Sequence, residues 1–167
     1  MTGSVRDYFR AQSYGQFAPE FDVVGPLTAA NDMAYYGRHS GNNNDSHVPE
    51  LVWEACLQAD PLVNFADYDW NGDGEADLVY MVYAGYSEAQ GAAPETIWPQ
   101  KWYLTMYQSL QLDGVTIDGY ACSSELRGTS GSELDGIGTA CHEFSHCLGL
   151  PDTYDMIHGS QTREEAV

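Results

Sequence analysis

Basic residues are scarce in this chain of 167 residues, which has 6 lysines and arginines against 25 aspartates and glutamates. The formal net charge of -19 repels phosphate backbones and anionic membrane surfaces, so nucleic acid is excluded as the expected partner. The sequence has no run of about 18 to 20 apolar residues, and we therefore expect no membrane span. Residues 1–10 have no apolar segment behind their charges, so no export signal is recognised.

Cysteines are also few, and the four of them are unevenly spaced without a CxxC pair. A disulfide-dense scaffold is therefore excluded, and Cys141 and Cys147 are expected to be buried thiols rather than metal ligands. Three histidines outside the motif described below have no partner pattern and are expected to be ordinary surface or loop residues: His39, His47 and His158. Hydrophobic residues make up 43% of the chain, which predicts a single folded domain over residues 1–167.

Local patterns of apolar residues predict both helices and strands. Apolar residues at three- and four-residue steps predict an amphipathic helix over 48–59, with Pro49 in its first turn. The continuous apolar run 78–83 predicts a strand that is buried on both faces and lies centrally in a sheet. Residues 98–107 fit either a strand or a helix. We also expect an edge strand at residues 21–24, a surface loop at 37–46 and a second strand at 115–123.

The most specific motif is an HExxH sequence at residues 142–146. Helical residues four apart lie one turn apart on the same face, so both imidazoles point to one side with Glu143 beside them. Apolar side chains fall on the opposite face of this helix. Gly149 followed by Pro151 is expected to end the helix in a sharp turn, and this turn can bring Asp152 back toward the histidines.

This arrangement of side chains predicts zinc chemistry. Two neutral imidazoles at this spacing bind Zn²⁺ at about 2.0 to 2.1 Å, and a third protein ligand leaves the fourth position open for water. Zinc lowers the pKa of that water to about 7, and Glu143 can accept its proton during attack on a scissile carbonyl. A chance HExxH is expected only about 0.01 times in a chain of this composition, which disfavours the competing interpretation of incidental surface histidines.

The segment from Gly138 to Asp155 resembles the HExxHxLGLPDxYD signature of the immune inhibitor A family, a family of secreted bacterial zinc metalloendopeptidases. The resemblance covers about Val5 to Asp155, because other stretches are similar to the family in the same order: residues 21–26 with 34–37, 69–74 and 97–102. It implies the α+β fold class and a zincin-like catalytic domain. Such a domain has a twisted mixed β-sheet, an active-site helix and a backing helix, for which 48–59 is the candidate.

The resemblance also implies roles for individual residues. His142 and His146 are the implied zinc ligands, and Glu143 is the implied catalytic general base. Asp152, six residues beyond His146, is the expected third ligand, and Asp155, nine residues beyond it, is the alternative. Protein or peptide substrates and a secreted or cell-surface location are implied as well. Because no export signal, propeptide or Met-containing turn is recognised, we expect an incomplete catalytic domain.

An acidic segment precedes the strand expected at 78–83. From Asp67 to Asp77 an oxygen-bearing side chain occurs at every second residue, with glycines for the sharp bend, as calcium loops require. One register begins at Asp67, and the preferred one begins two residues later, with the ligands Asp69, Asn71, Asp73, the Glu75 carbonyl and Asp77. We expect structural Ca²⁺ here, and the competing interpretation is an ordinary turn with solvated charges.

Two hypotheses on function follow from these motifs. The first is a zinc-dependent metalloendopeptidase that holds an extended peptide along an exposed sheet edge. The alternative is a calcium-stabilised binding or adhesion domain in which the HExxH is vestigial. Elemental analysis of the purified protein distinguishes them, because the alternative predicts calcium without a transition metal.

Overall fold

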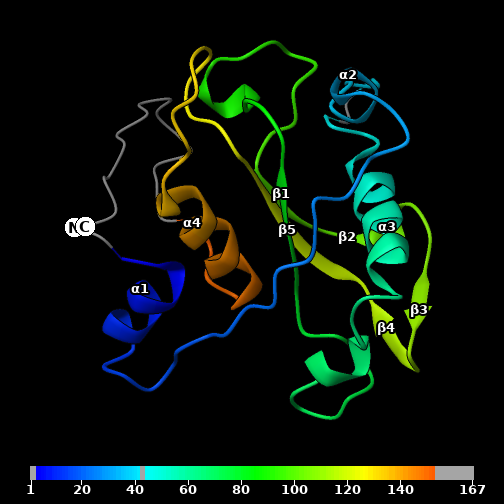
Figure 1. Cartoon of the computed structure of the whole chain (residues 1–167), viewed down its shortest axis with the longest axis vertical. Helices are drawn as coiled ribbons and strands as arrows, with labels where there is room; N and C mark the ends of the chain where they lie inside the picture. Colours follow the sequence, from blue (N-terminus) through cyan, green and yellow to red (C-terminus); the bar gives the residue numbers. More distant parts are fainter. Residues whose placement is uncertain (1–2, 42–43, 153–167) are drawn as a thin grey trace.

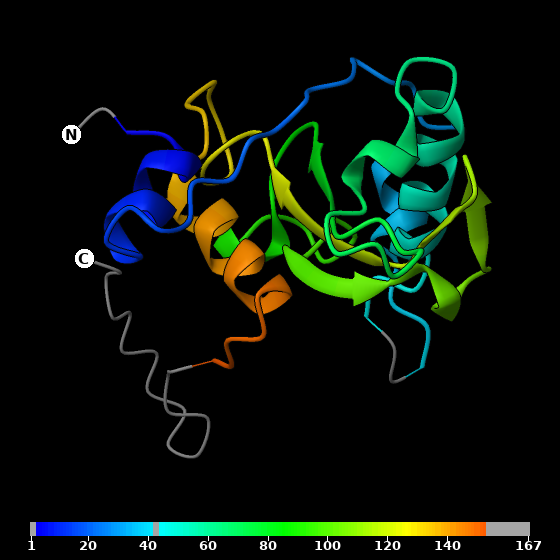
Figure 2. The same cartoon turned by 90° about the horizontal axis from the view of Figure 1, so that it is seen from below.

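The structure is a computed structural model that describes residues 3–41 and 44–152. Its helices and strands form a small α+β domain, the class expected from the sequence. Figures 1 and 2 show the main sheet between helix α3 on one side and helices α4 and α1 on the other. The α-helices are α1 (Val5–Gln12), α2 (Met33–Tyr36), α3 (Val48–Ala59) and α4 (Ile137–Cys147). The strands are β1 (Val79–Tyr83), β2 (Gln100–Tyr103), β3 (Leu110–Leu112), β4 (Val115–Ile117) and β5 (Gly119–Ser124).

The main sheet is mixed and has the strand order β1-β5-β2. Strand β1 is parallel to β5 and β2 is antiparallel to it, while β3 and β4 form a separate two-stranded hairpin. The expectation of a central strand at 78–83 is therefore wrong, because β5 lies between the other two strands. Nor is β1 buried on both faces, since Val82 is 63% exposed. The expected strand at 115–123 is divided between β4 and β5.

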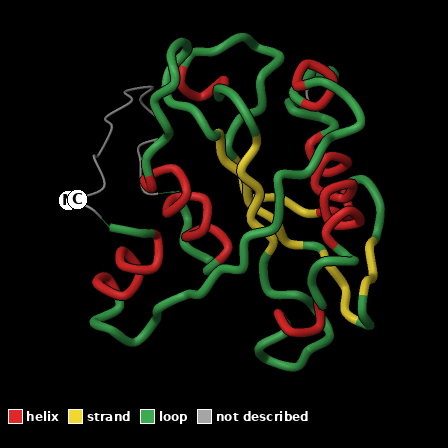
Figure 3. The backbone as a smooth tube through the Cα atoms, in the orientation of Figure 1, coloured by secondary structure: helices red, strands yellow, loops and turns green. Residues whose placement is uncertain are grey.

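The expected edge strand at residues 21–24 is also wrong. Residues 18–29 have neither helix nor strand, and Figure 3 shows this part of the chain as a long loop. Phe21 packs against Phe144 of α4 with ring centroids 5.6 Å apart, and Thr28 exchanges hydrogen bonds with Gln58 of α3. The segment therefore crosses the molecule from α4 to α3 instead of pairing with the sheet.

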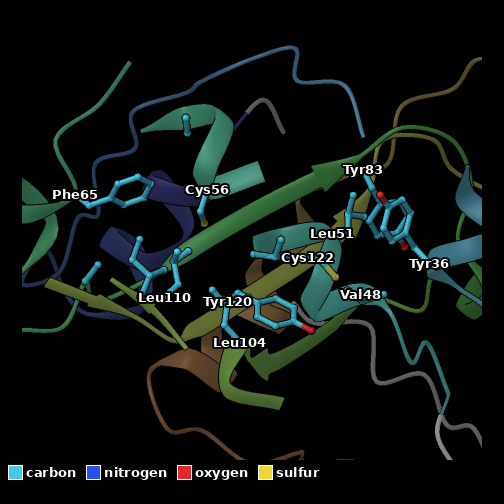
Figure 4. Packing of buried hydrophobic residues seen from close by; sticks show 14 of the residues in the cluster. Tyr36, Val48, Leu51, Cys56, Phe65, Tyr83, Leu104, Leu110, Tyr120 and Cys122 are labelled. Carbon is cyan, nitrogen blue, oxygen red and sulfur yellow. The ribbon is translucent and has the colours of Figure 1, made fainter. Parts of the chain in front are cut away.

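Two hydrophobic clusters surround the sheet. The larger one lies between the sheet and α3, as Figure 4 shows, and includes Val48, Cys56, Tyr120 and Cys122. The smaller one contains Phe9 of α1 together with Cys141 and Phe144 of α4. Helix α3 therefore backs the sheet as expected, while α1 supports α4 from the outer side.

Helix α1 was not expected from the sequence, although its start carries a local signal. Ser4 accepts a hydrogen bond from the Asp7 backbone N–H, and the Asp7 carboxylate accepts one from the Ser4 backbone N–H. This reciprocal capping satisfies two of the N–H groups that a helix start leaves free. None of the helices in the described residues has both the length and the apolar character needed to cross a membrane.

Candidate metal centre

Helix α4 carries the HExxH motif, and its orientation follows from its apolar face. Cys141 and Phe144 are buried, and the Phe144 ring lies 4.9 Å from the Phe9 ring of α1. The expected apolar face is confirmed at these two positions, whereas Ile137 and Leu148, at the helix ends, are 41% and 48% exposed. With one face held in this cluster, the helix directs its histidines to another side.

Three side chains converge at the end of α4. The Nε2 atoms of His142 and His146 lie 3.1 Å apart. One carboxylate oxygen of Asp152 lies 3.4 Å from the His142 Nε2 and 3.3 Å from the His146 Nε2. Four ligands at tetrahedral angles and zinc distances of 2.0 to 2.1 Å are about 3.3 to 3.4 Å from one another. The three atoms therefore have the spacing of ligands around one zinc-sized ion.

The turn after α4 places Asp152 and orients His146. Gly149 adopts a left-handed conformation with φ +85°, as the sequence predicted for the helix end. The Leu150 N–H donates to the Ser145 carbonyl, and the Leu150 carbonyl accepts a hydrogen bond of 2.8 Å from Nδ1 of His146. With its proton on Nδ1, His146 has a free lone pair on Nε2, which is the atom nearest the other two ligands.

The charges at the centre favour metal binding and proton transfer. Burial lowers the pKa of His142, and the neighbouring His146 lowers it further, which favours the neutral imidazole that a metal requires. Glu143 is only 7% exposed, and burial raises its pKa to about 7. A carboxyl group with a pKa near the working pH can both accept and donate a proton.

Residues 2–166 match the family model described as immune inhibitor A peptidase M6, catalytic domain. The chain belongs to this family. It is 31% identical over 173 residues to the pre-pro-metalloprotease PrtV of Vibrio cholerae serotype O1 (strain M66-2), covering 91% of this chain and 19% of PrtV. It is 25% identical over 174 residues to immune inhibitor A of Bacillus thuringiensis subsp. alesti, covering 90% of this chain and 25% of that protein.

The chain thus spans about a fifth to a quarter of the length of these relatives. The match identifies the chain as a peptidase M6 catalytic domain, in agreement with the resemblance found in the sequence. The family also implies a metal, and the donor set on α4 and its following turn suits one.

Some residues that the sequence singled out are either outside the described residues or directed away from the candidate metal centre. Asp155, the alternative third ligand, lies outside the described residues, as does His158. Cys147 points elsewhere, because its thiol donates to the Glu143 carbonyl within the helix. All four cysteines are free thiols, and those at 56, 122 and 141 are buried while Cys147 is half-buried.

The acidic loop of this M6 domain is held together by its own side chains. The Asp69 carboxylate accepts hydrogen bonds from the backbone N–H groups of Gly72, Asp73 and Gly74. The backbone of Glu75 forms an isolated β-bridge with Thr116, which joins the loop to β4. Asp77 accepts a hydrogen bond from the Trp70 N–H. These bonds give the loop a defined shape, and the assignment of Ca²⁺ to it stays a prediction.

A second group of possible metal ligands was missed by the sequence analysis. Among residues 3–41 and 44–152, two groups of three histidine, cysteine, aspartate or glutamate side chains have ligand atoms within 4.8 Å of one another. One is the centre on α4, and the other contains His39, Asp45 and Glu88. No local motif predicts the second group, because its members are separated by up to 49 residues.

Proposed function

We propose that the chain is the zincin-like catalytic domain of a zinc-dependent metalloendopeptidase. The observation that supports zinc is the mutual spacing of 3.1 to 3.4 Å among the ligand atoms of His142, His146 and Asp152. When bound, zinc polarises a peptide carbonyl and lowers the pKa of water at its open position. The spacing and the family together count against the alternative of a binding or adhesion domain with a vestigial motif.

Glu143 is the proposed general base of peptide hydrolysis. It follows His142 directly on α4 and is enclosed by the fold, so its carboxyl group is positioned without a mobile loop. Its carboxylate accepts the proton of the attacking water, and the resulting acid donates that proton to the amine of the leaving peptide. The pKa of about 7 suits both steps at neutral pH.

The proposed substrate is a protein segment in extended conformation. Strand β2 pairs with β5 on one edge, and among the described residues no strand pairs with its other edge. An extended peptide can add to such an edge through main-chain hydrogen bonds. Trp102 and Tyr103 at the end of β2 are about half exposed and offer aromatic surface to substrate side chains.

The remaining proposals concern the metal at the acidic loop and the location of the protein. We assign structural Ca²⁺ to the loop from Asp67 to Asp77, with Asp69 as its first ligand, on the alternation of oxygen-bearing side chains. Calcium loops of extracellular modules bind at about 10⁻⁴ to 10⁻³ M, which requires an environment rich in calcium. Together with the family resemblance, this supports a secreted or cell-surface location.

The catalytic proposal is tested by separating zinc content from hydrolysis. We expect purified chain to retain zinc at the α4 centre after dialysis, and His142→Ala to lose it. Glu143→Gln is expected to keep the zinc but to hydrolyse a quenched fluorescent peptide library about 10² to 10⁴ times more slowly. Glu133→Gln is the matched control, because Glu133 is exposed and pairs with Arg127 at the surface. Equal hydrolysis by Glu143→Gln and the control would contradict the role of Glu143.

The same zinc measurement identifies the third ligand. Asp152→Asn removes a charge that lies 3.3 to 3.4 Å from the two histidines, and we expect it to weaken zinc binding by more than about 100-fold. Asp155→Asn is expected to change it only a few-fold. The reverse ranking of the two variants would assign the ligand to Asp155.

A further inference from the structure

A second convergence of ligand atoms lies away from α4. His39 and Asp45 belong to the connection between α2 and α3, and Glu88 begins the short 3-10 helix Glu88–Gln90. The His39 Nε2 and a Glu88 carboxylate oxygen are 3.2 Å apart. His39, Asp45 and Glu88 each offer one ligand atom, and these three atoms lie within 4.8 Å of one another.

Asp45 gives this group a property that a surface ion pair lacks. Its side chain is buried, with 4% of the residue exposed. The Oδ2 atom accepts one long hydrogen bond of 3.2 Å from the Trp98 N–H, while the buried Oδ1 accepts none from the described residues. A buried carboxylate oxygen without a partner is unfavourable unless a cation neutralises it or the carboxyl group binds a proton.

The His39–Glu88 pair alone does not satisfy the charges present. A protonated His39 balances one carboxylate, and two carboxylates face it. The pair of His47 and Glu50 provides a comparison within the same chain, because its atoms are 3.0 Å apart and no third acidic ligand joins them within residues 3–41 and 44–152. The group around Asp45 therefore has both the donor atoms and the excess negative charge that attract a divalent ion.

We propose that His39, Asp45 and Glu88 form a second metal site, which binds a divalent transition-metal ion of the Zn²⁺ class. An imidazole nitrogen with two carboxylates suits zinc, whereas Ca²⁺ takes six to eight oxygen ligands. The side chains of His39 and Glu88 are 34% and 21% exposed, so the ion can enter from solvent. The bound ion joins the chain before α3 to the chain after β1. Its role is structural, and it shares no ligand with the α4 centre.

The test removes the α4 centre so that the second site can be measured alone. The full chain with His142→Ala and His146→Ala is titrated with Zn²⁺ by calorimetry, and metal content is measured after dialysis. We expect one zinc per chain in this background. Adding Glu88→Gln or Asp45→Asn is expected to weaken its binding at least tenfold. Glu50→Gln in the same background is the matched control, because Glu50 also pairs with a histidine, and it is expected to bind as the background does.

Two outcomes would overturn the proposal. One is a background variant that is folded by circular dichroism and binds no zinc. The other is a Glu88→Gln variant that binds zinc as tightly as the Glu50→Gln control. If the double histidine variant does not fold, zinc is counted in the otherwise unchanged chain. The expected count then falls from two to one with Glu88→Gln, while peptide hydrolysis, which depends on the α4 centre, is unchanged. A count of one that Glu88→Gln leaves unchanged also overturns the proposal.

Discussion

Glu143 is a carboxyl group that the fold holds in an unfavourable environment. Its pKa of about 7 lies above the ordinary value of 4.5, chiefly because of burial. A raised carboxyl pKa means that the folded state binds the proton more tightly than the unfolded chain. The stability that this group contributes is therefore complete below pH 4.5 and is lost as the pH rises through about 7. Burial of this carboxyl group thus lowers the free energy of unfolding at neutral pH.

We expect Glu143→Gln to stabilise the metal-free chain at alkaline pH, because glutamine carries no charge to bury. The difference between the Glu143 pKa of about 7 and its ordinary value of 4.5 corresponds to about 3 kcal/mol. This is the upper limit of the gain in unfolding free energy at pH 8. At pH 5 the gain is expected to fall below about 1 kcal/mol. Urea unfolding with chelator present measures both values, and Glu133→Gln serves as the exposed control. An equal gain at pH 5 and pH 8 would show that the burial of charge is not its cause.

The residues of the α4 centre could be predicted because they are close in sequence. His142, Glu143 and His146 lie within two turns of one helix, and Gly149 ends it where Asp152 can return. The group of His39, Asp45 and Glu88 could not be predicted in this way. Its ligand atoms meet only because α2, α3 and the chain after β1 pack together, and such contacts leave no periodic pattern in the sequence.

At the scale of elements, local periodicity predicted helices better than strands. The residues of α3 and α4 carry their apolar faces at helical spacing, so their helical state does not depend on distant partners. Which strand is central depends on pairing between β1, β5 and β2, and the order of these strands in the sheet differs from their order in the sequence. Strand β5 is buried along almost its whole length although it ends in two serines. Its amino-acid composition therefore did not indicate that it is the central strand.

The glycines at the two ends of α4 provide a paired prediction. Gly149 has φ +85° with open space around an added Cβ, so Gly149→Ala costs only backbone strain, about 1 kcal/mol of unfolding free energy. Gly138 lies inside the first turn and also has open space, so Gly138→Ala is expected to gain about 0.5 kcal/mol. Urea unfolding measures both changes. Gly149→Ala should also weaken zinc binding, because the Leu150 carbonyl that orients His146 follows it. A loss of stability without weaker zinc binding would mean that the turn does not position the ligands.

At the scale of the whole molecule, the net charge of -19 favours the binding of cations to the folded chain. Carboxylates confined to a small volume repel one another, and this repulsion destabilises the compact state. Glu75 illustrates the effect in the acidic loop, because burial and then the charge of Asp118 raise its pKa, as do Asp73 and Asp77. Divalent cations relieve this repulsion wherever the side-chain oxygens are arranged to bind them.

Calcium is therefore expected to raise the unfolding temperature of the chain. With a dissociation constant of about 10⁻⁴ to 10⁻³ M, 10 mM Ca²⁺ adds about 1.4 to 2.7 kcal/mol, or about 3 to 10 °C for a domain of this size. Differential scanning calorimetry with equal Mg²⁺ separates specific binding from charge screening. The preferred register uses Asp77, so Asp77→Asn should abolish the calcium response while Asp67→Asn preserves it. The opposite result would assign the loop to the register that begins at Asp67. An equal response to Ca²⁺ and Mg²⁺ would contradict the assignment of a specific calcium site to the loop.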